Sequence, residues 1–230
     1  MNYNKKTFRA EFLNLCDEKY QEFSKKIAIG KLEPVGIRVP KLKELAKNLA
    51  KSNWQDFFET EENWCSEIII LKGLVLGYAK LDIGQFLNYL HQFFEMVESW
   101  AETDVCAASF KIIKKNQQRV FDEILPYLYC KKEYKVRLAI TILLDYFLTD
   151  DWIDKVLELL PKIRQGKYYV DMAIAWTLSV CFVKYREKTL DILKKKVFSK
   201  FVQNKAVQKC RESFRVSEED KQLLQKYKLQ

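Results

Sequence analysis

Apolar residues recur along this chain at the spacing of helices that bury one face. After Pro40, leucine or alanine occupies positions 42, 45, 46 and 49, which is the i, i+3, i+4, i+7 pattern. Pro40 itself suits the first turn of a helix. A more uniformly apolar stretch from Leu138 to Phe147 predicts a helix that is buried more completely.

Polar breaks separate the later apolar segments. The helix predicted around Val156 follows the break 149–151, where Thr149 or Asp150 would cap it. Pro161 and Gly166 then separate that helix from another that begins near Tyr168.

Polar residues near the starts of several predicted helices lie at a nearly constant interval. The steps between them are 37, 33, 34 and 33 residues, for Glu67, Asp104, Arg137, Asp171 and Asn204. Each step has room for two helices and two short loops, the length signature of an α-helical hairpin repeat. We therefore expect an all-α superhelix, a solenoid of HEAT-like repeats with a concave groove, as a single domain over residues 1–230.

Composition agrees with helices and excludes several kinds of chemistry. Only 6 Gly and 4 Pro punctuate the 230 residues, which argues against a turn-rich β fold. The six cysteines are at least 24 residues apart and the single histidine, His91, lies between apolar neighbours, so we expect neither a metal nor a cofactor. No phosphate-binding glycine loop or hydrolase motif occurs. Without an apolar signal core or a membrane-length apolar run, we expect a soluble, cytoplasmic protein.

Charge is spread unevenly along a chain of net charge +9. Residues 52–110 carry a net −8, and residues 184–230 carry a net +8. A basic face is compatible with a nucleic-acid partner, although any single lysine can equally be a solvated surface residue.

Four residues stand out as a possible site. Trp100 and Asp104 share one helix face at i,i+4, and Arg137 and Trp176 lie in two further apolar helices. Each also has a structural interpretation. Trp100 and Trp176 could be packing residues, Asp104 a first-turn acid favoured by the helix dipole, and Arg137 a partner of Glu133. Only their joint occurrence favours a functional site.

The residues around these four resemble the DNA alkylation repair family, the AlkD-like alkylpurine DNA glycosylases built from HEAT-like repeats. The similar stretches are GIRVPKLKELAK at 36–47, SWAETD at 99–104, YKVRLAITILL at 134–144 and YYVDMAIAWTLS at 168–179. The resemblance implies that Trp100, Asp104, Arg137 and Trp176 form the active groove. It also implies duplex DNA containing alkylated purines as the substrate, and we expect a monomer.

The chemistry implied by the resemblance is hydrolysis of the glycosidic bond of a cationic purine such as 3-methyladenine or 7-methylguanine. Asp104 would stabilise the cationic sugar and orient a water, and the two indoles would add cation–π stabilisation. Arg137 would hold a backbone phosphate. The residues expected to contact DNA are Arg137, Lys135, Lys205, Lys209, Arg211 and Arg215.

The chain departs from the family at two positions near the expected groove. Active members tend to carry a lysine where this chain has Met172 and an arginine where it has Ser179. Two alternatives therefore stay open: a non-catalytic nucleic-acid-binding member of the same family, and a helical-repeat scaffold that binds another protein.

Overall fold

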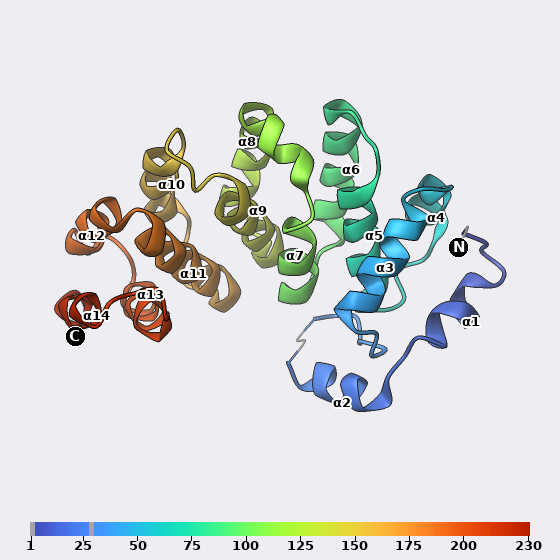
Figure 1. The fold of residues 1–230 in the computed structure, drawn as a ribbon, viewed down its shortest axis with the longest axis horizontal. Helices are drawn as coiled ribbons and strands as arrows, with labels where there is room; N and C mark the ends of the chain where they lie inside the picture. The colour runs from blue at the N-terminus through green and yellow to red at the C-terminus, as the bar shows by residue number, and fades with distance from the viewer. Residues whose placement is uncertain (1–2, 28–29) are drawn as a thin grey trace. The chain divides into compact units, whose positions relative to one another are not determined.

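A computed structural model describes residues 3–27 and 30–230 (Figure 1). Within these ranges the chain forms 14 α-helices and three short 3-10 helices and contains no β-strand, which confirms the all-α prediction. The chain divides into two compact units, Met1–Glu123 and Ile124–Gln230. The single repeat domain expected over 1–230 stays a prediction.

The first unit holds seven complete α-helices and one 3-10 helix, and α8 begins in it. They are α1 (Phe8–Leu13), α2 (Glu18–Ile27), α3 (Val39–Leu49), α4 (Trp54–Thr60), α5 (Ser66–Tyr78), α6 (Ile83–Met96), α7 (Trp100–Ala107), η1 (Lys111–Lys115) and α8 (Gln117–Ile124). The predicted helix after Pro40 is α3, and its four apolar positions are buried. Pro40 stands in the first turn of α3, as expected.

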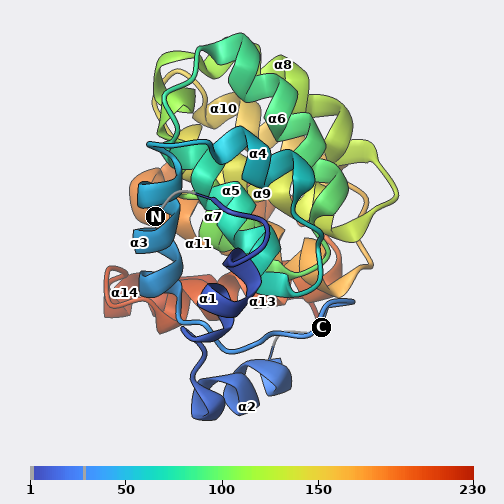
Figure 2. The same ribbon diagram turned by 90° about the vertical axis from the view of Figure 1, so that its right-hand side faces the viewer.

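Helix α5 is the centre of this unit. Every residue from Ser66 to Leu76 is buried, because α3, α4, α6 and α7 all contact this helix. Its sequence SEIIILKGLVLGY is apolar on all sides, as expected of a helix that has no face toward water. Figures 1 and 2 show α3 and α7 on two sides of α5.

Two glycines let α5 approach its neighbours closely. A Cβ atom on Gly73 would lie 2.5 Å from Cys106 Sγ and 2.5 Å from the Phe93 ring. One on Gly77 would lie 2.0 Å from Ser109 Oγ. No side chain fits at either contact without a shift of the neighbouring helices, so glycine is required here for packing.

A buried carboxylate anchors the segment that leads into α3. Glu67 accepts hydrogen bonds from the backbone N–H groups of Val35, Gly36 and Ile37, at 3.0, 2.7 and 3.2 Å from N to O. Gly36 takes a φ of +91°, a conformation that favours glycine. Glu67, the first residue of the repeat spacing, therefore satisfies backbone donors inside the protein.

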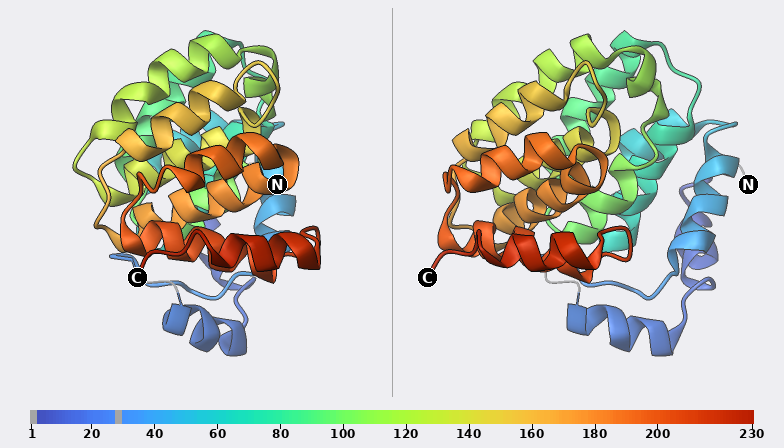
Figure 3. Two further views of the ribbon diagram at one scale, coloured as in Figure 1. Left: turned by 90° about the vertical axis from the view of Figure 1, so that its left-hand side faces the viewer. Right: turned by 60° about the vertical axis from the view of Figure 1, so that its left-hand side comes forward.

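The second unit contains two short 3-10 helices and six α-helices. They are η2 (Leu125–Tyr129), α9 (Glu133–Tyr146), α10 (Ile153–Leu159), η3 (Leu160–Lys162), α11 (Tyr168–Lys184), α12 (Arg186–Lys194), α13 (Lys200–Glu212) and α14 (Glu218–Gln225). Helix α11 is central and contacts α9, α12 and α13, and α14 packs along α13 (Figure 3). Because α11 has neighbours on several sides, ten of its residues are buried.

The elements predicted from the later apolar segments are confirmed, but the predicted cap is wrong. The buried helix around 138–147 is α9, and α11 begins at Tyr168 as expected. The N-cap of α10 is Trp152, and no side chain caps it. Thr149 contributes its carbonyl, which accepts the N–H of Ile153 at 2.9 Å, because the chain turns one residue later than the polar break suggests.

All six cysteines are free thiols, and four of them, Cys65, Cys106, Cys181 and Cys210, are buried. Burial raises the pKa of both Cys181 and Cys210 to about 12, so these thiols are protonated at neutral pH. They act as small apolar core residues. Among the described helices, none is both long and apolar enough to cross a membrane.

One cation is buried within the first unit. The Lys72 ammonium donates to the Glu61 carbonyl at 2.7 Å and to Asn63 Oδ1 at 2.9 Å. Burial lowers the pKa of Lys72 to about 8, since the two neutral acceptors do not compensate fully for lost hydration.

The depressed pKa makes the stability of the wild type depend on pH in one direction. Between pH 8 and 10.5 the unfolded chain binds a proton at Lys72 that the folded chain does not. The contribution of Lys72 to the unfolding free energy therefore rises across this window, by about 2–3 kcal/mol. We expect the stability difference between wild type and Lys72→Met, measured by urea denaturation, to shift by this amount in favour of wild type.

A matched control separates this effect from general alkaline titration. Lys80 lies beyond the end of the same helix and is exposed. The difference in unfolding free energy between Lys80→Met and wild type should stay constant from pH 8 to 10.5. If the difference between Lys72→Met and wild type is constant as well, the depressed pKa of Lys72 is contradicted.

Candidate functional site

Trp100 and Asp104 lie on α7 in the first unit, as the i,i+4 spacing predicts. A capping box starts this helix, in which Ser99 Oγ accepts the Glu102 N–H and the Glu102 carboxylate accepts the Ser99 N–H. Both candidate residues are half-buried. The cap fixes where the helix begins, and so places the indole and the carboxylate one turn apart.

Hydrogen bonds hold both side chains. Trp100 Nε1 donates to the Ile27 carbonyl at the end of α2, at 2.9 Å. The Thr103 hydroxyl lies 2.9 Å from the Trp100 carbonyl and 2.9 Å from Asp104 Oδ1. Because a hydroxyl has one proton, the carboxylate and the carbonyl share this donor.

A second acid near Asp104 is committed to the fold. Glu102 is buried, and its carboxylate accepts from the N–H groups of Glu98 and Ser99 and from Ser66 Oγ. Burial raises the pKa of Glu102, and these hydrogen bonds oppose the rise. Burial, followed by the charges of Glu102 and Asp104, also raises the pKa of the Cys106 thiol. Of these groups, Asp104 is the candidate for chemistry.

Arg137 lies on α9 in the second unit and is 7% exposed. Its Nη1 donates to the Tyr169 carbonyl of α11 at 2.8 Å, and its guanidinium carbon lies 6.0 Å from the centroid of the Tyr169 ring. Trp176 is seven residues further along α11, or roughly 10 Å along the helix axis. Arg137 therefore contacts the first turn of α11, two turns before Trp176.

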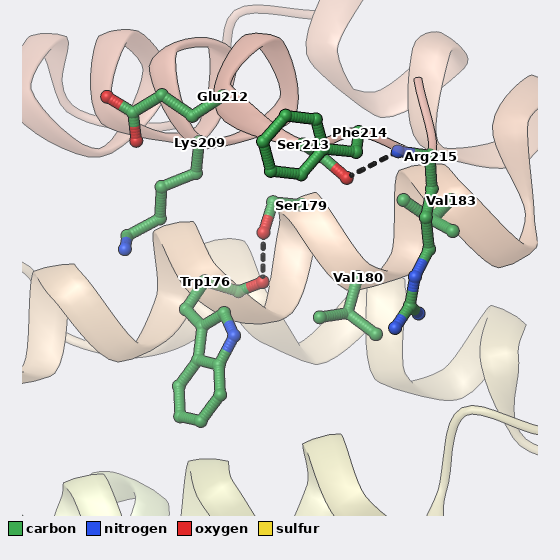
Figure 4. A pocket seen from close by; sticks show the side chains of 9 residues that line it. All are labelled: Trp176, Ser179, Val180, Val183, Lys209, Glu212, Ser213, Phe214 and Arg215. Atoms are coloured by element: carbon green, nitrogen blue, oxygen red, sulfur yellow. Dashed lines mark hydrogen bonds between the residues drawn. The ribbon is translucent and has the colours of Figure 1, made fainter.

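Trp176 is half-buried and lines a pocket of about 380 Å³ between α11 and the end of α13. The other residues that line it are Ser179, Val180, Val183, Lys209, Glu212, Ser213, Phe214 and Arg215. In Figure 4 the side chains of Lys209 and Arg215 extend from the α13 segment toward α11, on either side of Ser179. An indole beside two cations can accept a planar or anionic group.

Met172 and Ser179 lie on the same helix as Trp176. Met172 is half-buried one turn before it. Ser179 is buried, lines the pocket, and donates its hydroxyl to the Trp176 carbonyl at 2.7 Å. This hydrogen bond is local to α11, so the pocket depends on Lys209 and Arg215 for positive charge.

The predicted phosphate contacts on α13 and just after it divide between two pockets. Lys209 and Arg215 line the Trp176 pocket, whereas Lys205 and Arg211 line a second pocket of about 780 Å³. Lys135 is half-buried on α9. Sequence reasoning missed Phe214, which is fully exposed beside Arg215; an apolar residue between Ser213 and Arg215 in a polar segment was the available signal.

The structure thus brings together parts of the predicted site. It places Trp100 with Asp104 in the first unit, and Trp176 with Lys209 and Arg215 in the second. Their meeting in one groove stays a prediction. Over the described residues, no cluster of three or more metal-ligating side chains occurs. Comparisons with protein-family models, curated proteins and solved structures found no significant match.

The hydrogen bond from Arg137 to α11 allows a structural role of this arginine to be tested. Arg137→Met removes the charged donor to the Tyr169 carbonyl, and we expect a loss of about 1–3 kcal/mol in unfolding free energy. Arg164→Met, which changes an exposed arginine of the same unit, is the control and should stay within about 0.5 kcal/mol of wild type. Urea denaturation measures both. Unchanged stability of Arg137→Met would show that this hydrogen bond does not hold α9 to α11.

Proposed function

We propose that this chain is a DNA repair enzyme, an alkylpurine DNA glycosylase. The observation that carries the proposal is the Trp176 pocket, where an indole lies with Lys209 and Arg215 at one edge of α11. Trp100 and Asp104 on one face of α7 supply the second half of the expected groove. The resemblance of the flanking segments to the DNA alkylation repair family relates the two halves.

The order and contacts of the helices support the proposed HEAT-like solenoid. The residues of the repeat spacing lie near the starts of α5, α7, α9, α11 and α13, so each step contains two helices. Within the first unit α3, α5 and α7 contact one another in series, and within the second α9, α11 and α13 do the same. Serial contact of alternate helices is the packing of stacked helical hairpins.

In the proposed reaction, a cationic base leaves with the electron pair of its glycosidic bond and becomes neutral. Positive charge then develops on the deoxyribose, where the Asp104 carboxylate and the indole faces stabilise it. Asp104 also orients a water whose oxygen bonds to the anomeric carbon and whose proton is released to solvent. The substrate already carries the positive charge, so this chemistry uses neither a metal nor a cofactor.

Cations supply the proposed contacts with duplex DNA. We propose that Lys209 and Arg215, which line the pocket with Trp176, hold phosphates there. The other proposed contacts are Lys135, Arg137, Lys205 and Arg211. We propose a cytoplasmic monomer. The alternative is a non-catalytic nucleic-acid-binding relative. It rests on Met172 and Ser179, which are uncharged, so the pocket has no third cation; the Ser179 hydroxyl bonds within its own helix.

The proposed reaction is tested by incubating methylated duplex DNA with wild type and with Asp104→Asn. We expect wild type to release 3-methyladenine and 7-methylguanine, measured by chromatography. The amide cannot stabilise the sugar cation as the carboxylate does, so Asp104→Asn should release them about 10²–10³ times more slowly. Asp122→Asn, an exposed position in the same unit, should match wild type.

The outcomes separate the alternatives. DNA binding without base release by wild type would favour the non-catalytic relative. Absence of DNA binding at low salt would favour the protein-binding scaffold. Equal rates for wild type and Asp104→Asn would remove Asp104 from the mechanism.

Adding a cation at position 179 tests whether duplex DNA reaches the Trp176 pocket. Ser179→Arg would extend a guanidinium into this pocket, so we expect tighter duplex binding and a salt slope steeper by about 0.9, as for one added phosphate contact. Ser179→Gln has a long but uncharged side chain and should leave the slope unchanged. The measurement is fluorescence anisotropy at several salt concentrations. If log affinity falls with log salt at the same slope for both variants, duplex DNA does not bind at this pocket.

A further inference from the structure

Four aromatic side chains form a continuous row of ring contacts across three helices of the second unit. The ring of Phe201 on α13 lies 6.0 Å from that of Tyr168 on α11, measured between centroids. Tyr168 lies 5.1 Å from Tyr169, and Tyr169 lies 5.2 Å from Tyr134 on α9. We call these four residues the aromatic row. Tyr168 is 57% exposed and Phe201 41%, so two ring faces are available to a ligand.

The row follows the repeat spacing. Tyr134, Tyr168 and Phe201 are separated by 34 and 33 residues, the same steps that separate the polar residues near the starts of α9, α11 and α13. Because α9, α11 and α13 contact one another in series, equal steps place one aromatic residue at the beginning of each helix. The row is therefore a regular surface feature of this unit rather than a single exposed ring.

Positive charge lies beside the exposed end of the row. Phe201 lines the second pocket, of about 780 Å³, and its remaining lining residues are Lys200, Asn204, Lys205, Gln208, Arg211 and Lys228. Four of these are cations and none is an acid. Lys205 Nζ lies 5.9 Å from the centroid of the Phe201 ring. An aromatic face beside four cations is complementary to a ligand that is both aromatic and anionic.

The acids nearest to this surface have hydrogen-bond partners within the protein. Glu133 accepts the N–H of Tyr169 at 2.7 Å, and Asp171 accepts that of Gly166 at 3.0 Å. Glu212 accepts from the Gln208 amide at 2.7 Å. In the amide orientation that satisfies both groups, the side-chain oxygen of Gln225 accepts from the Arg211 guanidinium. The neutral donors to the three acids hold the carboxylates in place without cancelling their charge, and the pocket itself is lined by four cations and no acid.

We propose that this surface binds single-stranded nucleic acid. Two neighbouring bases stack on Tyr168 and Phe201, and the phosphates that follow contact Lys200, Lys205, Arg211 and Lys228. Stacking on aromatic side chains within a cationic groove is how proteins hold single strands without sequence preference. A duplex cannot bind in this way, because its bases are already stacked on one another. The proposal does not rest on glycosylase activity.

The test measures binding of the full chain to a fluorescein-labelled thymidylate strand of about 12 nucleotides, within the usual range of site sizes. Leucine in place of both aromatic residues, Tyr168→Leu with Phe201→Leu, keeps apolar volume but removes the ring faces. We expect affinity to fall by about tenfold or more, since stacking on each base contributes substantially. Phe201→Trp keeps a ring face and should bind at least as tightly as wild type.

Two controls make the test specific. Phe23 of the first unit is exposed to a similar degree, and Phe23→Leu should bind like wild type. Lys200→Gln and Lys205→Gln should each reduce the slope of log affinity against log salt by about 0.7, the value for one phosphate contact on a single strand. Both rings are exposed, and circular dichroism verifies that the variants are folded.

Further arms identify the strand and separate this proposal from the glycosylase. A uridylate strand of the same length distinguishes RNA from DNA, and tighter binding of either supports the proposal. Failure of wild type to bind either strand at low salt would overturn it, as would equal affinities for wild type and the double leucine variant. An equal loss of duplex affinity in the double leucine variant would also overturn it, because the bases of a duplex cannot stack on the two rings. If wild type binds the single strand but releases no base from methylated duplex DNA, only the proposed glycosylase activity is refuted.

Discussion

Burial of one central helix is the constraint on which each unit depends. Helices α5 and α11 are largely apolar and each is covered by helices on several sides, although α11 keeps Tyr168 exposed and Trp176 half-buried. Burying a single leucine or isoleucine side chain stabilises a fold by about 1.5–3 kcal/mol, and each central helix buries several. The covering helices are held in place by that burial, and their outer faces are left to carry charge. The cations of α13 lie on such a face.

The sequence alone predicted the elements well, because hydrophobic spacing reflects the same burial. The starts of α3 and α11 follow from the apolar pattern and from prolines and glycines, whereas α9 begins at Glu133, five residues before the apolar stretch that predicted it. The cap of α10 did not follow, since whether Thr149 uses its side chain or its carbonyl depends on where the chain turns. The anchoring role of Glu67 was also out of reach, because its partners at 35–37 are some 30 residues away and are backbone groups.

For the candidate site, local spacing predicted local geometry and little more. Trp100 and Asp104 share a helix face because four residues make about one turn. The inward orientation of Arg137 was not visible, because its acceptor is a carbonyl on another helix. The aromatic row was visible in principle. An aromatic residue stands three positions before each of Arg137, Asp171 and Asn204, namely Tyr134, Tyr168 and Phe201. The polar residues alone define the repeat spacing, so they do not reveal the aromatic row.

The acids at the helix starts have one further consequence. Glu67, Glu133 and Asp171 bind backbone N–H groups, which every residue except proline possesses. The anchored segments can therefore change most of their side chains during evolution and stay attached. Replacing the acid removes the acceptor, and a change in the anchored segment does not restore it. Sequence drift in a lineage of such proteins should accumulate in the loops and spare these carboxylates. Binding surfaces could then diversify on a scaffold that stays the same.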